Sequence, residues 1–183
     1  DIQFIDEFSQ SRSNGVLDRI WKTYYEGISR ANYLLHYGSG IDMDEDLRSR
    51  ILGEAKFLRA YFYFNLVNTF GDIPLKLNPP INEDEINKPK STSAMVYEQI
   101  EKDLTESIPV LETTYTSADV GRVTKGAALG LLAKVYLYQG KWSDALAKIA
   151  EVEGLGLYSL QPVYKNNFID STQNKSESLF EIQ

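Results

Sequence analysis

The stretch from Gly121 to Val152 constrains the fold of this chain more than any other part of its sequence. It places small and aromatic residues at fixed intervals on either side of a glycine: Ala133, Tyr136, Gly140, Trp142 and Ala145. Because alanine side chains are short, Ala133 and Ala145 allow two helix backbones to approach closely, and the aromatic rings fill the space beside them. The sequence therefore predicts two helices that pack against each other and are joined at the glycine.

This spacing is typical of tetratricopeptide repeats, in which pairs of helices are held together by packing. Such packing requires no catalytic group, so the pattern favours a scaffold that presents surfaces. Apolar residues elsewhere recur at steps of three and four, which is the period of a helix with one buried face. Together they predict helices over residues 16–37, 45–70, 92–111, 124–138 and 143–153.

Residue types at the ends of these segments support their boundaries. Thr92, Thr124 and Ser143 stand where a hydroxyl can accept a hydrogen bond from the first turn of a helix. The helical period disappears after Leu155, and the apolar pair within residues 178–182 predicts a short strand. The predicted fold class is mainly α, with tetratricopeptide-like helix pairs in an α-α superhelix. A short strand and an irregular segment follow at its C-terminal end.

Length and composition exclude several classes of function. The 183 residues suit one domain of ordinary size, and the net charge of −7 disfavours nucleic acid because phosphate binding needs a basic face. The chain has no cysteine and a single histidine, His36, so it has neither a disulfide nor a thiolate or multi-histidine metal site. No apolar run approaches the roughly 20 residues that cross a bilayer. We expect no metal and no cofactor.

Three motifs that superficially suggest chemistry have simpler interpretations. Asp42-x-Asp44-x-Asp46 resembles the start of a calcium-binding loop, but the glycine and glutamate required at its sixth and twelfth positions are missing. The segment Gly121–Gly126 lacks the Gly-Lys-Ser/Thr order of a phosphate-binding loop, and Gly126 and Gly130 indicate close helix contacts instead. The acids at 83–85 lie in a predicted solvated loop. We therefore predict no catalytic residue and no enzyme.

Two polar residues fall among apolar neighbours in the predicted helices. Asn32 lies beside the apolar stripe of the helix over 16–37, and Arg59 lies in the middle of the helix over 45–70. Buried polar groups need hydrogen-bond partners. We interpret both residues as structural, with Arg59 paired to a carboxylate or to loop carbonyls, while contact with a ligand is the alternative interpretation.

The aromatic residues divide into a predicted core set and one candidate for binding. Five of them stand at helical spacing and are predicted to be buried: Trp21, Tyr24, Tyr61, Tyr136 and Trp142. Tyr115 instead lies in a polar loop and is flanked by threonines. Because a flat ring beside hydroxyl groups can stack on the face of a pyranose, Tyr115 is the candidate ligand-binding residue.

Four segments of the chain match the motifs of a known protein family, and they follow one another in that family's order. The first contains Trp21, Tyr24, Ile28, Ala31 and Asn32. The second runs from Glu54-Ala55-x-Phe57-Leu58-Arg59-Ala60 to Gly71-Asp72-Ile73-Pro74-Leu75. The third runs from Gly121-Arg122-Val123-Thr124-Lys125-Gly126-Ala127-Ala128 to Ala133-x-Val135-Tyr136-Leu137, and the fourth is Asn174-x-x-x-Ser178-x-Phe180-Glu181-Ile182. Together they cover most of residues 16–183 and resemble the N-terminal portion of the SusD/RagB family of outer-membrane nutrient-binding lipoproteins.

The resemblance implies a function and a location. Members of this family bind glycans or other nutrients at the cell surface without catalysis and deliver them to a SusC-like TonB-dependent transporter in the outer membrane of Gram-negative bacteria. Residues 1–183 would form part of a single SusD-like helical domain. Because members usually carry a signal peptide, a lipidated cysteine and a long C-terminal half, we expect the lipid anchor and that C-terminal half to be absent from this chain.

The resemblance also implies which residues belong to a structural family motif. These are Trp21, Asn32, Arg59, Gly71, Asp72, Pro74, Gly121, Arg122, Ala133, Tyr136 and Ala145. If a C-terminal half normally covers the last helix pair and the strand, we expect this chain to expose an apolar patch.

The alternative function is a tetratricopeptide-type adaptor scaffold that binds peptides in a cytosolic assembly. Only the stretch 121–152 follows the tetratricopeptide pattern well, and the helix pairs do not recur at its regular period of about 34 residues. An upstream signal peptide would favour surface capture, and a cytosolic start methionine would favour the adaptor.

Overall fold

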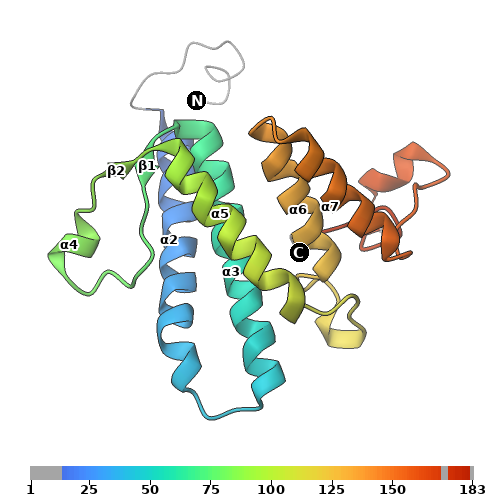
Figure 1. Ribbon diagram of the computed structural model, residues 1–183, viewed down its shortest axis with the longest axis horizontal. Coiled ribbons are helices and arrows are strands. Elements are labelled where there is room, and N and C mark those ends of the chain that lie inside the picture. The colour runs from blue at the N-terminus through green and yellow to red at the C-terminus, as the bar shows by residue number, and fades with distance from the viewer. Residues whose placement is uncertain (1–13, 170–172, 182–183) are drawn as a thin grey trace.

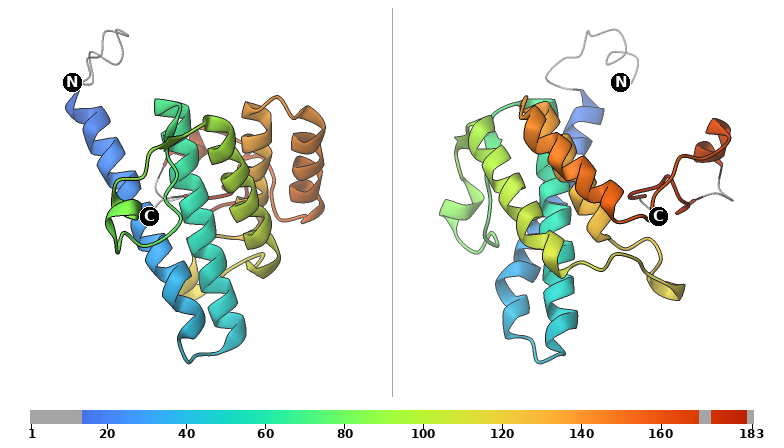
Figure 2. Two further views of the ribbon diagram at one scale, coloured as in Figure 1. Left: turned by 60° about the vertical axis from the view of Figure 1, so that its left-hand side comes forward. Right: turned by 45° about the vertical axis from the view of Figure 1, so that its right-hand side comes forward.

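The computed structural model describes residues 14–169 and 173–181, and the chain is mainly helical. The long helices are α2 (Gly15–Tyr37), α3 (Glu45–Phe70), α5 (Ser93–Ser107), α6 (Lys125–Tyr138) and α7 (Trp142–Gly154). Each packs against its neighbours along the chain, and the most extensive contacts are those of α3 with α2 and α5 and of α6 with α7. Figures 1 and 2 show the resulting row of helices, with α2 and α7 at its two ends. The predicted helical fold class is confirmed.

Short elements occupy the connections between these helices. The segment after α3 contains β1 (Ile73–Pro74), the single-turn helix α4 (Glu83–Ile86) and β2 (Lys90–Ser91). The two strands pair antiparallel, with Ile73 opposite Ser91 and Pro74 opposite Lys90. The 3-10 turns are η1 (Gly38–Gly40), η2 (Ile108–Val110), η3 (Ser117–Asp119) and η4 (Tyr164–Phe168). Sequence analysis missed α4 and the strand pair because elements of two to four residues are too short to show a period.

Side-chain caps explain where most of the helices begin. As predicted, Thr92 and Thr124 accept hydrogen bonds from the backbone N–H groups of the third helical residue, at 3.4 Å in α5 and 3.1 Å in α6. Asn14 and Asp44 cap α2 and α3 in the same way. The predicted cap at Ser143 is wrong. Gly140, with a φ of 72°, turns the chain directly after α6, so that α7 already begins at Trp142 and has no side-chain cap.

The third predicted helix, over residues 92–111, is shorter than expected. The α-helix α5 ends at Ser107 and continues only as the 3-10 turn η2. Pro109 lies in that turn, and a proline cannot donate the backbone hydrogen bond that would continue an α-helix.

The hydrophobic core lies where α3, α5 and α6 meet. Its largest fully buried apolar side chains include Phe57, Tyr63 and Leu66 from α3, Ile100 and Leu104 from α5, and Leu129 and Leu132 from α6. Ile28 joins them from α2, and Ile73 from β1. Because α3 contributes to this core along most of its length, it is the helix that positions the elements on either side of it.

Most of the aromatic residues that were predicted to be buried do contact the core. Four of them are half-buried against it: Trp21, Tyr24, Tyr61 and Tyr136. The prediction is wrong for Trp142, whose residue is 67% exposed. Ala145 of α7 is buried, and it lines the same groove between α6 and α7 as the buried Ala133. Trp142 stays exposed because α7 ends the row of helices and, among the described helices, packs mainly on α6.

The predicted strand over residues 178–182 is also wrong for its described part, since residues 178–181 form no strand and Ile182 lies outside the described residues. This segment is instead anchored by its side chains. The ring of Phe180 lies 5.1 Å from that of Phe57 and 6.1 Å from that of Tyr61, both in α3.

Gly126 and Gly130 provide close contacts, but not between helices as predicted. A Cβ atom at Gly126 would lie 2.1 Å from the Tyr158 hydroxyl, and one at Gly130 would lie 2.8 Å from the Leu179 side chain. Both partners belong to the irregular segment after α7. The two glycines therefore let this segment lie against α6.

Candidate functional site

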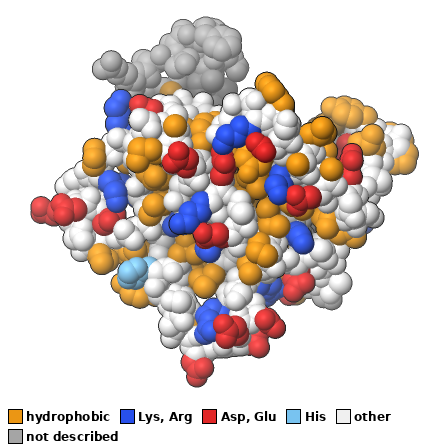
Figure 3. Space-filling model, viewed as in Figure 1, with side chains coloured by type: hydrophobic (Ala, Val, Ile, Leu, Met, Phe, Trp, Pro, Cys, Tyr) orange, Lys and Arg blue, Asp and Glu red, His pale blue; other side chains and the backbone are white. Residues whose placement is uncertain are grey.

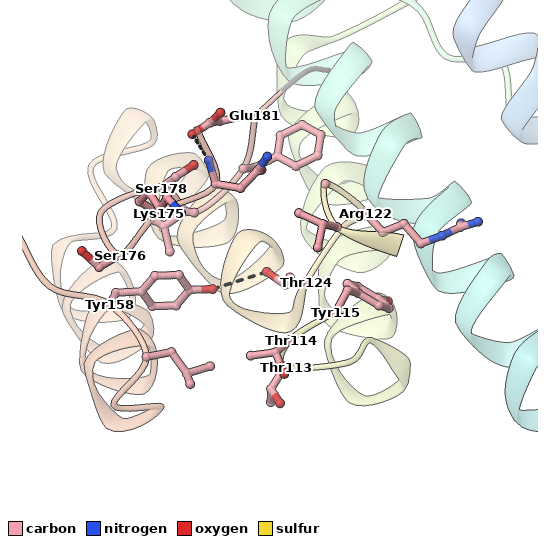
Figure 4. Close-up of a pocket in the computed structure, with 16 residues that line it drawn as sticks. Thr113, Thr114, Tyr115, Arg122, Thr124, Tyr158, Lys175, Ser176, Ser178 and Glu181 are labelled. Carbon is pink, nitrogen blue, oxygen red and sulfur yellow. Dashed lines mark hydrogen bonds between the residues drawn. The ribbon is translucent and has the colours of Figure 1, made fainter. Parts of the chain in front are cut away.

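An open cleft of about 380 Å³ lies between the loop that precedes α6 and the irregular segment that follows α7. Figure 4 shows the side chains that line it from both sides. The loop contributes Thr113, Thr114, Tyr115, Val120, Gly121, Arg122 and Thr124. The later segment contributes Leu157, Tyr158, Asn174, Lys175, Ser176, Ser178, Leu179, Phe180 and Glu181. The lining therefore combines two tyrosine rings with several hydroxyl groups.

Ion pairs hold the loop side of the cleft against α3. The Arg122 guanidinium lies 2.9 Å from a carboxylate oxygen of Glu54 in α3, and it also donates to Asp119 in the loop. The carboxylate of Glu54 is enclosed, with its side chain 14% exposed. These contacts raise the pKa of Arg122, the Asp119 hydrogen bond first and the Glu54 charge second. The loop is thus fixed to the helix that forms the centre of the fold.

Tyr115 lies in the cleft wall, where the Arg50 guanidinium carbon is 5.4 Å from the centre of its ring. This is a cation–π contact from α3, and the tyrosine is half-buried. Burial, followed by the negative charge of Glu54, raises the pKa of the Tyr115 hydroxyl. The hydroxyl therefore stays protonated at neutral pH. Because Arg50 occupies one face of the ring, a ligand would have to use its other face or its edge.

Tyr158 forms part of the opposite wall, and sequence analysis missed it. Its hydroxyl lies 3.4 Å from the Thr124 hydroxyl, as the dashed line in Figure 4 shows. The ring lies over Gly126, where there is no Cβ atom to obstruct it. The signal in the sequence was Gly126 itself, since a glycine inside a helix often marks a close approach by another group.

Backbone and side-chain hydrogen bonds shape the segment on this side of the cleft. The Ser159 N–H donates to the Ser176 carbonyl at 2.8 Å, and the Gln161 N–H donates to the Glu177 carboxylate at 2.7 Å. The Asn174 N–H donates to Glu181 at 3.0 Å. These bonds tie the stretch around residues 159–161 to the stretch around residues 174–181, and Phe180 fastens the segment to α3.

The lining of the cleft suits binding by hydrogen bonds and ring contacts. Among the described residues that line the cleft, Glu181 is the only carboxylate and there is no histidine. No group of three or more potential metal ligands occurs in residues 14–169 and 173–181. Hydroxyl, amide and ammonium groups beside tyrosine rings can instead contact the hydroxyls and the apolar face of a sugar.

Asn32 and Arg59 lie outside this cleft, in a buried polar network. The Arg59 guanidinium donates two hydrogen bonds to Asp103 of α5, at 2.8 Å from Nε and 2.7 Å from Nη2. Its Nη1 atom donates to the Asn32 side-chain oxygen at 2.8 Å and to the Leu77 carbonyl at 3.4 Å. The predicted structural hydrogen bonds, to a carboxylate and to a loop carbonyl, are confirmed.

The same network fastens the segment that follows β1. Asn32 donates to the carbonyls of Lys76 and Asn78 at 2.9 and 3.3 Å. The Tyr63 hydroxyl pairs with both the N–H and the carbonyl of Lys76, each at 2.7 Å, and its burial raises its pKa. The Tyr25 hydroxyl donates to the Pro74 carbonyl at 2.7 Å. Neither Asp103 nor Tyr63 could be assigned a partner from sequence, because both partners are distant along the chain.

The remaining predicted motif residues shape turns and helix starts. Gly71 ends α3 with a φ of 71°, a conformation that favours glycine. The Asp72 carboxylate accepts hydrogen bonds from the N–H and hydroxyl of Ser93 at the start of α5, and these bonds lower its pKa. Of the predicted motif residues, the structure brings only Gly121 and Arg122 into the cleft, together with the binding candidate Tyr115.

No helix in the part of the chain that the structure describes is both long and apolar enough to cross a membrane. Besides the cleft, apolar grooves lie between α2 and α3 and between α6 and α7, with volumes of about 330 and 320 Å³.

Comparison with known proteins identifies similar sequences. Residues 2–137 match the family model described as starch-binding and associating with the outer membrane. The chain is 30% identical over 183 residues to SusD-like protein P2 of Formosa agariphila, an alignment that covers 97% of this chain and 36% of that relative. It spans about a third of the length of the curated relatives it matches.

Comparison with solved structures gives the same result. A crystal structure of a SusD-like protein from Bacteroides fragilis superposes with a TM-score of 0.88 at 31% identity, over 96% of this chain and 35% of that one. A laminarin-binding SusD-like protein superposes with a TM-score of 0.83 at 39% identity, over 88% of this chain and 36% of that one.

Proposed function

This chain belongs to the SusD-like family of starch-binding, outer-membrane-associated proteins, and from that premise we propose that it is the N-terminal part of a non-catalytic glycan-binding protein of the cell surface. The observation that carries the proposal is the cleft between the loop at 113–124 and the segment at 157–181. Family membership favours this function over the peptide-binding adaptor.

The chemistry of the cleft matches that of a sugar chain. A pyranose offers an apolar C–H face and a rim of hydroxyl groups, which need an aromatic surface and hydrogen-bond partners respectively. Tyr115 and Tyr158 supply rings on opposite walls, while Thr124, Ser176 and Ser178 supply hydroxyls. A volume of about 380 Å³ is within the range of small-ligand pockets.

The lining residues support binding without hydrolysis. Glycoside hydrolysis generally uses two carboxyl groups that face each other across the scissile bond. Within the part of the chain that the structure describes, Glu181 is the only carboxylate that lines the cleft, and its side chain accepts a hydrogen bond from the Asn174 backbone. A ligand in this cleft would therefore be held and released unchanged.

The proposed role within the whole protein is capture and hand-over. The full-length protein would be held at the outer membrane of a Gram-negative bacterium by a lipid anchor and would pass the glycan to a SusC-like TonB-dependent transporter. Tethering beside the transporter raises the effective concentration of the ligand, so that each site can be weak. The net charge of −7 leaves neutral sugars unaffected and disfavours nucleic acid as a partner.

The test is binding to a panel of neutral and acidic oligosaccharides, followed by isothermal titration calorimetry on any that bind. We expect Tyr158→Ala to weaken binding about two- to tenfold, because an aromatic contact contributes about 0.5–1.5 kcal/mol beyond area burial. Tyr115→Ala should weaken binding as well.

Tyr164→Ala is the matched control, since Tyr164 is 77% exposed and does not line the cleft. It should leave the affinity unchanged. A wild-type chain that binds no glycan of the panel would overturn the proposed function. If neither cleft variant alters the affinity, the binding site lies elsewhere on the molecule.

A further inference from the structure

A second group of aromatic side chains lies at the C-terminal end of α2, on the surface of the molecule. Tyr33 and Tyr37 are 44% and 54% exposed, and their ring centres lie 6.2 Å apart with planes 20° from parallel. The His36 ring meets Tyr37 edge-on at 4.6 Å. Figure 3 shows the histidine, in pale blue, at the surface with hydrophobic side chains beside it.

Folding alone gives little reason for this arrangement. Two rings four residues apart on a helix stabilise it only slightly, and far less than burial of either ring would. Both tyrosines keep about half of their surface in contact with solvent, so each retains a ring surface that a ligand can cover.

Polar groups adjoin the rings on the same helix. A small pocket of about 90 Å³ is lined by Tyr25, Ile28, Ser29 and Asn32 of α2 and by Lys76, Asn78 and Pro80 of the segment after β1. Residues 29, 33 and 36 follow one another at helical steps of four and three, so the pocket and the rings share one side of α2. The hydrogen bonds from Asn32 to the Lys76 and Asn78 carbonyls fix the pocket wall.

The charged groups next to the rings already have partners. Glu26 and Arg30, one turn earlier on α2, form an ion pair with each other. The Lys76 ammonium donates to the Ile86 carbonyl at 2.7 Å. Two exposed rings and a small, mainly apolar pocket, beside charged groups that already have partners, suit an uncharged ligand.

We propose that Tyr33 and Tyr37 form a second sugar-binding surface, which takes a neutral glycan chain and is separate from the cleft. The inference rests on the proposed function, since the same kind of polymer would be held at both places. The two sites have no lining residue in common. A long glycan that reaches both would bind more tightly than a short one because the second contact is intramolecular.

The single histidine of the chain makes this surface directly observable. The His36 imidazole signals are followed by nuclear magnetic resonance during titration with laminarin and starch oligosaccharides, with calorimetry on the same samples. We expect a saturable shift of these signals in the wild-type chain and in Tyr158→Ala. The double variant Y33A/Y37A should lose at least tenfold in affinity at this surface and keep binding at the cleft.

The controls separate the second surface from the proposed function. Tyr164→Ala removes a more exposed ring elsewhere and should leave the titration unchanged. Both tyrosines of the double variant are exposed on a helix, so circular dichroism should show an intact fold. If calorimetry detects glycan binding while the His36 signals stay in place, the second surface is overturned and the proposed function stands. If the wild-type chain binds none of these oligosaccharides, both are overturned.

Discussion

At the scale of single residues, the pair formed by Arg59 and Asp103 connects three parts of the fold. Both residues are buried, at 7% and 1% exposed, and their two parallel hydrogen bonds join α3 to α5. Gln99 also donates to the Asp103 carboxylate, at 2.9 Å, and Asn32 links the guanidinium to α2. Since the side chains of Arg59, Asp103 and Asn32 are buried, removal of one partner leaves the others without compensation.

We therefore expect Arg59→Ala to lower the free energy of unfolding by about 3–5 kcal/mol, because it strands a buried carboxylate. Urea unfolding followed by circular dichroism measures this change. The double variant Arg59→Met with Asp103→Leu should be less destabilised than Arg59→Ala, since it leaves no buried charge.

Arg122→Ala provides the comparison, since its ion pair with Glu54 involves an arginine side chain that is 44% exposed. Loss of such a pair should cost at most about 1 kcal/mol. Equal effects of Arg59→Ala and Arg122→Ala would contradict the structural role of the buried network.

At the scale of elements, the contact between α6 and the segment after α7 decides the shape of the cleft. Gly126 leaves room for the Tyr158 ring, and an added methyl group would meet that ring within 2.6 Å. We expect Gly126→Ala to displace Tyr158 and to lower glycan affinity by about as much as Tyr158→Ala does. The helix itself should gain roughly 0.5–1 kcal/mol from the exchange, since glycine is a poor helix former.

The measurements are thermal unfolding and calorimetry on Gly126→Ala, Tyr158→Ala and the double variant. The two single changes remove the same contact, so the double variant should bind no more weakly than either. A Gly126→Ala chain that binds glycan like the wild type would show that Tyr158 does not shape the site.

Elements differ in how far the sequence predicts them, and the reason is physical. The long helices could be predicted because their apolar period and the caps at Thr92 and Thr124 are local signals. The segment after Leu155 carries no such signal, because Tyr158 and Phe180 are placed by contacts with α6 and α3. Of the residues that line the cleft, the sequence therefore indicated only Tyr115, on the loop side, as a candidate for binding.

The same limit applies to the buried network. The sequence indicated that Arg59 needs a partner, since an unpaired buried guanidinium is costly. It could not identify Asp103, which is 44 residues away and meets Arg59 only when α5 packs on α3. Trp142 shows the opposite case, in which a residue at helical spacing stays exposed because no described helix packs on that side of α7.

At the scale of the whole molecule, the row of helices ends in an uncovered apolar surface. Trp142, Leu146 and Ile149 of α7 are 67%, 67% and 46% exposed, and Ile149 also lines the groove of about 320 Å³ between α6 and α7. Burying a large apolar side chain contributes about 1.5–3 kcal/mol. The surface is therefore a strong candidate for contact with another helix, and relatives three times as long have further chain that could supply one.

In the 183-residue chain, we expect this surface to cause self-association. Sedimentation velocity should show a dimer or larger species whose share rises with concentration, and a hydrophobic dye should bind. The double variant Trp142→Gln with Leu146→Glu should be monomeric, because a buried carboxylate at the contact is unfavourable. Leu160→Glu changes a side chain that is 82% exposed outside α7 and should leave association unchanged. A wild-type chain that stays monomeric and binds no dye would contradict this prediction, because the exposed surface of α7 would then cause no association.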